Sequence, residues 1–130
     1  MALVHYILVV DDDPEVRDVL ATTLKAPGFY IFTAGDAFEA VYVLAERAID
    51  LMIIDVKMPA MSGFELARQA KLMRPYMHMI FMTGFSDGGD APFGAAFLRK
   101  PFRPDELIEA LRRELELDPP PRAGRRTVPR

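Results

Sequence analysis

Short apolar runs alternate with amphipathic segments along most of the chain. The runs are rich in β-branched and aromatic residues, and they cover residues 6–10, 30–34, 51–54, 79–82 and 96–98. A strand that is apolar on both faces is typical of a parallel sheet covered by helices on each side. The pattern therefore predicts five strands in the interior of the protein.

Segments with a helical period separate these runs. The first begins at Pro14, which suits the first turn of a helix, and it ends before Pro27-Gly28. Asp36, followed three residues later by Glu39, predicts the N-terminal cap of a second helix. Two further patterns, over residues 64–73 and 104–115, predict the third and the last helix. The core-facing stripe predicted for the first helix is Val16, Val19, Leu20 and Leu24.

Strands that alternate with helices imply an α/β fold whose parallel strands are joined by right-handed crossovers. One connection breaks the alternation. Ser86–Gly94 contains three glycines and a proline and has no apolar stripe. This composition predicts a loop or at most one turn, so we expect the helix between the fourth and fifth strands to be short or replaced by a loop.

Length and composition fit one domain. The 130 residues are 51% apolar, and none is cysteine, which excludes disulfides and cysteine metal sites. The N-terminal apolar run has no basic segment before it and leads directly into Asp11, so it is a poor signal peptide. No apolar run is long enough to cross a membrane. We therefore expect a cytoplasmic protein without membrane contact.

The net charge of −3 conceals a basic C-terminus. Residues 119–130 carry four arginines and no acid, which leaves 12 basic and 19 acidic residues in the rest of the chain. An acidic body argues against direct binding of nucleic acid. We expect a folded domain over residues 1–118 and a disordered Pro/Arg-rich tail over residues 119–130.

Polar side chains follow four of the five predicted strands. They are Asp11, Asp12 and Asp13 after the first strand, Asp55 after the third, Thr83 after the fourth and Lys100 after the fifth. The carboxyl ends of parallel strands meet at one edge of the sheet, where α/β proteins bind ligands. Each of these residues is common in turns when taken alone, but together they predict a site.

Clustered carboxylates imply either that one of them is protonated or that a cation is bound among them, because two charges ~4 Å apart repel by about 4 kcal/mol at an effective dielectric near 20. Oxygen ligands predict Mg²⁺, since His5 and His78 precede or start strands at the other edge. The Lys100 ammonium and the Thr83 hydroxyl are suited to phosphate oxygens. The set therefore predicts that one carboxylate attacks phosphorus to form an aspartyl phosphate.

Four motifs in order resemble the receiver domain of two-component response regulators. They are VVDDD, IIDVKMPAMSG, MTG and LRKPF, and the resemblance runs from Ile7 to about Leu117. It implies a flavodoxin-like, doubly wound sheet of five parallel strands in the order 2-1-3-4-5. It also implies a bacterial phosphoprotein of phosphorelay signal transduction.

The resemblance assigns roles to individual residues. Asp55 is the implied phosphoacceptor, and the implied Mg²⁺ ligands are Asp11, Asp12, Asp55 and the backbone carbonyl of Lys57. Thr83 and Lys100 are the implied partners of the phosphoryl oxygens, with a cis bond between Lys100 and Pro101. The remaining assignments are Phe97 as the switch aromatic, Asp13 as a neighbour that tunes the site without binding metal, and Pro59 and Gly63 as residues that shape the loop after Asp55.

The implied partners are a histidine kinase or a phosphotransfer protein, with output through a protein contact. The family uses the face formed by its fourth helix, fifth strand and fifth helix for output and dimerisation, and the short connection after Thr83 departs from that pattern. The segment IFMTGFS resembles a subgroup of single-domain receivers with a Phe-Ala-Thr-Gly-type motif, in which Met82 replaces the alanine. The sequence does not distinguish a complete single-domain regulator from a part of a longer protein.

Two other functions are compatible with the same residues. A phosphorylation-independent interaction module on this fold is the main alternative. A hydrolytic phosphatase with an aspartate nucleophile typically has a second aspartate two residues later, where this chain has Lys57. We therefore expect no enzyme activity beyond the chain's own phosphorylation and dephosphorylation. A flavin- or dinucleotide-binding domain is disfavoured because no glycine-rich loop follows the first strand.

Overall fold

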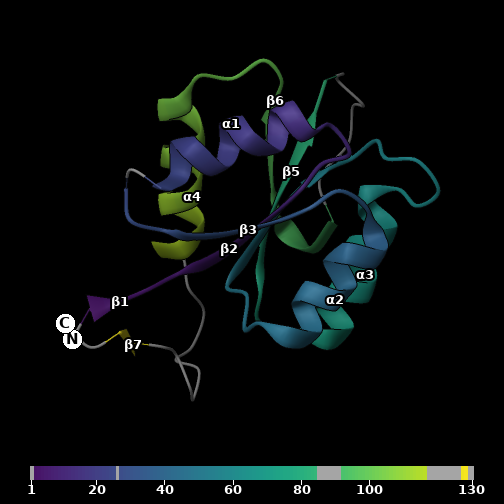
Figure 1. Cartoon of the computed structure of the whole chain (residues 1–130), viewed down its shortest axis with the longest axis horizontal. Helices are drawn as coiled ribbons and strands as arrows, with labels where there is room; N and C mark the ends of the chain where they lie inside the picture. The colour runs from purple at the N-terminus through teal and green to yellow at the C-terminus, as the bar shows by residue number, and fades with distance from the viewer. Residues whose placement is uncertain (1, 26, 85–91, 117–126, 129–130) are drawn as a thin grey trace.

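A five-stranded parallel sheet forms the centre of the computed structural model, which describes residues 2–25, 27–84, 92–116 and 127–128 (Figure 1). The sheet order is β3-β2-β4-β5-β6, which confirms the predicted order 2-1-3-4-5. The strands are β2 (Tyr6–Val10), β3 (Tyr30–Ala34), β4 (Leu51–Asp55), β5 (His78–Thr83) and β6 (Ala96–Arg99). In the described part of the chain the helices are α1 (Pro14–Lys25), α2 (Ala37–Glu46), α3 (Gly63–Met73) and α4 (Pro104–Glu116).

Two helices cover each face of the sheet, α1 and α4 on one side and α2 and α3 on the other (Figure 1). Successive residues of β2 serve both layers: Ile7 and Val9 pack toward α1 and α4, whereas Leu8 and Val10 pack toward α2 and α3. This two-sided burial explains why the strands are continuous apolar runs rather than alternating ones. The carboxyl ends of the strands are consequently the open edge for polar chemistry.

The helix boundaries follow from local side-chain bonds. The Asp36 carboxylate accepts a hydrogen bond from the Glu39 backbone N–H at 2.8 Å, which confirms the predicted N-cap of α2.

The prediction that Val19 faces the core is wrong, because its side chain is 62% exposed, while Leu20 is buried. Neighbouring helical positions differ by about 100°, so Val19 lies at the edge of the buried face of α1 and its side chain is directed away from that of Leu20.

The shortened fourth crossover ends in a single turn. Pro92–Gly94 forms a 3₁₀ turn, in which Phe93 has a positive φ of 62°. This turn agrees with the prediction of a loop or at most one turn, and residues 85–91 lie outside the described residues. The chain therefore reaches β6 without an α-helix among the residues that the structure describes.

The C-terminal tail differs from the prediction at two residues. Thr127–Val128 forms β7, which pairs in antiparallel fashion with β1 (Ala2–Leu3). The other residues of the 119–130 tail lie outside the described residues, so the extent of the folded unit remains a prediction.

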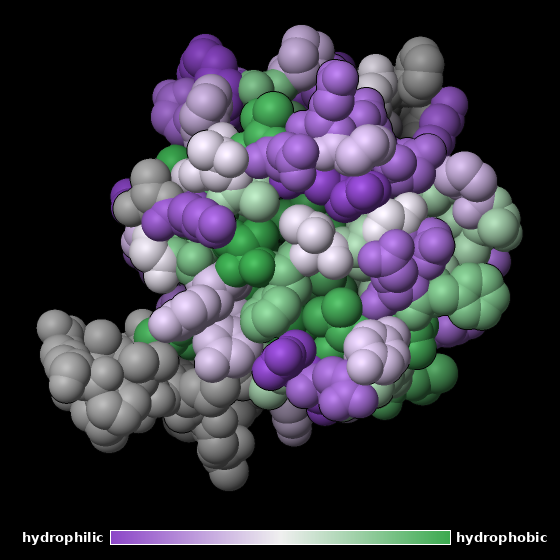
Figure 2. Space-filling view, in the orientation of Figure 1, coloured by the Kyte–Doolittle hydropathy of each residue, from purple (hydrophilic) through white to green (hydrophobic). Residues whose placement is uncertain are grey.

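On the face seen in Figure 2, apolar side chains gather in a band between α1 and α2, where the edge strand β3 lies in Figure 1. Within the described ranges, no helix is both long and apolar enough to span a membrane.

Candidate functional site

The register of the sheet brings the predicted polar residues to one edge. Asp55 is the last residue of β4, Thr83 is the last of β5, and Asp11 and Lys100 directly follow β2 and β6. Backbone hydrogen bonds continue just beyond the strands, from Asp11 N–H to the Ala34 carbonyl at 3.2 Å and from Lys100 N–H to the Thr83 carbonyl at 2.8 Å. This edge of the sheet, with Asp11, Asp55, Thr83 and Lys100, is called the rim below. Its geometry is therefore fixed by the same hydrogen-bond pattern as the sheet itself.

Three carboxylates converge at this rim. One oxygen from each of Asp11, Asp12 and Asp55 lies within 4.8 Å of the other two. At that separation each pair of charges repels by about 3 kcal/mol at an effective dielectric near 20. Asp11 and Asp55 are buried whereas Asp12 is exposed, so two charges are enclosed and the third faces solvent. This all-oxygen donor set fits a hard divalent cation such as Mg²⁺.

Lys100 supplies a positive charge between the two buried acids. Its ammonium lies 3.1 Å from Asp11 Oδ2 and 3.5 Å from Asp55 Oδ2. Burial lowers the pKa of Lys100, but the hydrogen bond to Asp11 and the two carboxylate charges outweigh burial and leave that pKa raised. Lys100 is therefore a fixed cation at neutral pH.

The surroundings of Asp55 raise the pKa of its carboxyl group. Burial is the main cause that raises its pKa, and the Asp11 charge adds to it, while Lys100 and the Lys57 backbone N–H act in the opposite direction. The net pKa of Asp55 lies above its ordinary value of 3.8. The Lys57 N–H donates to Asp55 Oδ1 at 3.2 Å, and the Lys57 side chain is exposed. A cation or a phosphoryl group with its own counter-charges would relieve this carboxylate.

The loop after Asp55 depends on close packing. Glycine often serves a loop by adopting a positive φ, but in this loop the positive φ belongs to Ala60, at 71°. Gly63 is required for a different reason, because a Cβ at this position would collide with the Asp55 backbone carbonyl. The missing side chain lets α3 begin directly against β4, the strand that ends in Asp55.

Two neighbours help to position Asp11, and the first of them, Arg17, was not identified from the sequence. The Arg17 guanidinium donates to the Asp11 backbone carbonyl at 2.7 Å, and Gly35 leaves the room that this guanidinium occupies. Side chains on a helix lean toward its N-terminus, so a basic residue one turn after Asp13 was the available signal. Asp13 itself does two things: its N–H donates to Asp11 Oδ1 at 2.9 Å, and its carboxylate accepts from the Glu15 N–H at 2.9 Å.

A family model described as response regulator receiver domain matches residues 7–112. The chain belongs to this family. It is 32% identical over 114 residues to the response regulator receiver protein CpdR of Brucella abortus, a match that covers 84% of this chain and 95% of CpdR. It is 34% identical over 118 residues to the transcriptional regulatory protein AruR of Pseudomonas aeruginosa, covering 83% of this chain and 48% of AruR.

Solved structures of receiver domains share the fold. The response regulator protein TrrA of Thermotoga maritima, solved in complex with Mg²⁺–BeF, superposes with a TM-score of 0.76 at 31% identity. This match covers 84% of the present chain and 97% of the TrrA chain. Receiver domains are signalling modules, so the rim just described belongs to a module that passes on a signal.

The remaining predicted features of the receiver site lie near this rim. The peptide bond between Lys100 and Pro101 is cis, as the resemblance implied. Thr83 is buried, and Phe97 on β6 is 37% exposed. The Phe97 ring lies 6.1 Å from that of Phe81, so it borders an aromatic cluster of the α3 face. The structure thus brings together the predicted residues, while their roles in phosphorylation and switching remain predictions.

Proposed function

We propose that this receiver domain accepts a phosphoryl group on Asp55 in a Mg²⁺-dependent reaction. The observation that carries the proposal is a buried Asp55 carboxylate flanked by the Asp11 carboxylate and by the Lys100 ammonium at 3.5 Å. A nucleophilic carboxylate needs positioning and neutralisation of phosphoryl charge more than it needs a base. The arrangement is suited to both needs.

The proposed reaction transfers a phosphoryl group from a phosphohistidine to the Asp55 carboxylate. An Asp55 carboxylate oxygen forms a bond to phosphorus, the P–N bond of a phosphohistidine breaks, and the electron pair of that bond leaves with the imidazole. Lys100 stays beside the new acyl phosphate and pairs with one of its oxygens, while Thr83 donates its hydroxyl to another. Mg²⁺, bound by Asp11, Asp12, Asp55 and the Lys57 carbonyl, would supply further neutralisation of the phosphoryl oxygens.

The proposed output is a shift between two conformations. Phosphorylation adds charge and acceptor oxygens at Asp55, Thr83 moves toward them, and Phe97 rotates inward from its half-exposed position. We expect the segment from residue 84 to 94, of which 85–91 lie outside the described residues, to become ordered or to shift. Hydrogen exchange of this segment with and without beryllofluoride tests the switch, and unchanged protection would contradict it.

The phosphodonor is proposed to dock beside Lys100. An apolar groove of about 480 Å³ lies between α1 and the start of the β6–α4 connection, and its lining includes Val16, Val19, Pro101 and Phe102. Lys100 borders both this groove and the acceptor carboxylates, so a helix seated in the groove would carry a phosphohistidine to Asp55. We infer that the occupant is a histidine kinase or a phosphotransfer protein of a bacterial, cytoplasmic pathway.

Labelling by acetyl phosphate tests the acceptor chemistry. Wild-type protein should gain the mass of one phosphoryl group in MgCl₂ and none in EDTA, and Asp55→Asn should gain none. Asp105→Asn is the matched control, because this carboxylate is exposed at the start of α4, and it should label like the wild type. If the wild type neither labels nor binds beryllofluoride, the proposal fails and the phosphorylation-independent module takes its place.

Docking is tested separately from acceptor chemistry. Val19→Glu places a charge in the groove on an exposed position, so it should slow phosphotransfer from purified histidine kinases of the source organism at least about ten-fold. Labelling of the same variant by acetyl phosphate should be unchanged. Equal loss with both donors would place the defect in the fold or the site rather than in docking.

A further inference from the structure

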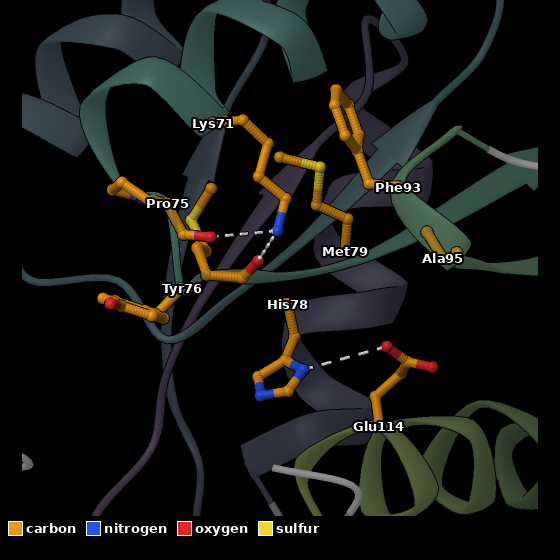
Figure 3. A pocket seen from close by; sticks show the side chains of 10 residues that line it. Lys71, Pro75, Tyr76, His78, Met79, Phe93, Ala95 and Glu114 are labelled. Atoms are coloured by element: carbon orange, nitrogen blue, oxygen red, sulfur yellow. Dashed lines mark hydrogen bonds and ion pairs between the residues drawn. The ribbon is translucent and has the colours of Figure 1, made fainter. Parts of the chain in front are cut away.

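A second cavity lies at the opposite end of β5 from the phosphoryl site. It has a volume of about 270 Å³ and is bordered by α3, by the start of β5, by the Pro92–Gly94 turn and by α4 (Figure 3). The stagger of the strands creates this space. β6 begins with Ala96 paired to Ile80, so the first two residues of β5 extend past the end of β6.

One end of the cavity carries an ammonium group. Lys71 points from α3 into the cavity, and its Nζ donates to the backbone carbonyls of Met77 at 2.8 Å and Pro75 at 3.3 Å (Figure 3). The same ammonium lies 5.7 Å from the centre of the Phe93 ring. An ammonium has three N–H donors, so these bonds fix the position of the charge and leave one donor for a ligand.

The other end carries the Glu114 carboxylate, which has no close hydrogen-bond donor within the part of the chain that the structure describes. Glu114 on α4 is 17% exposed, and its ion pair with His78 Nδ1 is 3.9 Å long, beyond hydrogen-bond distance. Among the described residues, no group donates a hydrogen bond to this carboxylate at ordinary distance. A mostly enclosed carboxylate usually accepts such bonds, so Glu114 can accept a hydrogen bond from a positively charged ligand group.

The two opposite charges attract each other across the cavity without forming a contact ion pair in the described part of the chain. Burial is the main cause that lowers the pKa of Lys71 and raises the pKa of Glu114. The Glu114 charge offsets only part of the shift at Lys71, and His78 together with Lys71 offsets only part of the shift at Glu114. The opposite charges near Lys71 and Glu114 therefore do not fully compensate for the burial of these two groups. A molecule that brought a carboxylate to one end and an ammonium to the other would satisfy both.

We propose that this cavity binds a free α-amino acid, with the ligand carboxylate on Lys71 and the ligand ammonium on Glu114. Met79, Ala95 and the Phe93 ring provide an apolar wall between the two charges, which suits an aliphatic side chain. The volume is just below the range of about 300–1,000 Å³ that is common for drug-sized ligands, so an amino acid is of fitting size. The site is independent of Asp55 chemistry and stands whether or not the domain is phosphorylated.

Titration of the full chain with L-leucine, followed by two-dimensional ¹H–¹⁵N NMR, tests the proposal. Saturable shifts should appear at His78, Phe93 and Ala95. The carboxylate-only analogue 4-methylpentanoate and the amine-only analogue isoamylamine should each bind at least about ten-fold more weakly. Glycine should also bind more weakly, because it lacks the side chain that contacts the apolar wall.

Two variants separate the ends of the site. Glu114→Gln retains the shape of the side chain and should weaken L-leucine binding at least about ten-fold, and Lys71→Met should do the same. Glu46→Gln and Lys25→Met are matched controls on exposed positions outside the cavity, and both should bind like the wild type. Thermal unfolding checks that each variant is folded.

The outcomes are distinct. No saturable shift at the cavity residues overturns the proposal, as does equal binding of L-leucine and 4-methylpentanoate, which would make the cavity a simple anion site. Unchanged binding by folded Glu114→Gln overturns the assigned orientation. A positive result in the Asp55→Asn background, where labelling by acetyl phosphate is absent, shows that the site does not depend on the proposed phosphorylation.

Discussion

Replacing Lys100 by methionine tests how much the buried rim depends on one positive charge. The substitution keeps the length of the side chain and removes the ammonium that lies 3.1 Å from Asp11 and 3.5 Å from Asp55. At an effective dielectric near 20, each of these attractions is worth about 5 kcal/mol before the cost of desolvation. Their removal leaves two buried carboxylates that repel each other by about 3 kcal/mol.

The net cost is smaller than these gross terms. Breaking a fully buried ion pair costs about 3–5 kcal/mol, whereas exposed pairs contribute about 0–1 kcal/mol. The Lys100 side chain is 28% exposed and that of Asp11 is 1% exposed, so we expect a loss of about 2–3 kcal/mol in the free energy of unfolding. With an m-value of about 1–3 kcal/mol/M, the urea midpoint in EDTA should fall by about 1–2 M.

The pH dependence of this loss follows from the two shifted groups. The pKa of Lys100 is raised above 10.5, so its stabilising charge is present at neutral pH and is lost as the pH rises through the folded-state value. The pKa of Asp55 is raised above 3.8, so the interaction with Asp55 weakens as the pH falls through that raised value. The difference between variant and wild type should therefore be largest near neutral pH.

The matched control is Arg113→Met. Arg113 and Glu109 form an ion pair of 3.3 Å, a similar distance, but their side chains are 67% and 65% exposed. This variant should change the stability by less than about 0.5 kcal/mol. Saturating MgCl₂ should narrow the deficit of Lys100→Met, because a divalent cation replaces the lost charge. Equal urea midpoints for Lys100→Met and wild type in EDTA would refute the electrostatic account of the rim.

Three further predictions follow from single contacts. Gly63→Ala should lose about 1–3 kcal/mol of stability in urea unfolding, because its Cβ meets the Asp55 carbonyl; Gly84→Ala, with open space around the Cβ, should stay within about 0.5 kcal/mol. Arg17→Met should weaken Mg²⁺ binding about ten-fold in calorimetry, since Arg17 orients the backbone of Asp11 at the proposed metal site. Unchanged affinity would contradict this positioning role. Glu114→Gln should be at least as stable as the wild type at neutral pH, because burial raises the pKa of the Glu114 carboxyl group and so makes its charged form unfavourable. This advantage should vanish below the ordinary carboxyl pKa of 4.5, where Glu114 is protonated in both the folded and the unfolded state. A variant less stable than the wild type at neutral pH would contradict the raised pKa.

Local patterns were sufficient for most of the fold. Continuous apolar runs identified the strands, since each must bury both faces, and Pro14 and Asp36 identified helix starts through backbone geometry and capping. The edge that carries the acids also followed from sequence order, because parallel strands present all their carboxyl ends on one side. These features depend on neighbouring residues or on a rule that holds for every parallel sheet.

Contacts between distant segments could not be predicted in this way. The exposure of Val19 depends on which helix neighbours α1, and the need for glycine at position 63 depends on how closely α3 approaches the Asp55 carbonyl. The bond from Arg17 to Asp11 requires the direction of a side chain on a packed helix. Each of these is a distance between elements, and apolar periodicity specifies which face is buried but not what that face touches.

The sequence alone thus determined the strand order through its family resemblance, the polar residues that meet at the rim and the shortness of the connection before β6. Only the tertiary structure decided that a cavity lies between Lys71 and Glu114 at the other end of β5. These two residues are 43 positions apart in the chain. The physical reason is that the stagger of β5 and β6 and the packing of α3 and α4 set the separation of the two charges, and no local pattern encodes that separation.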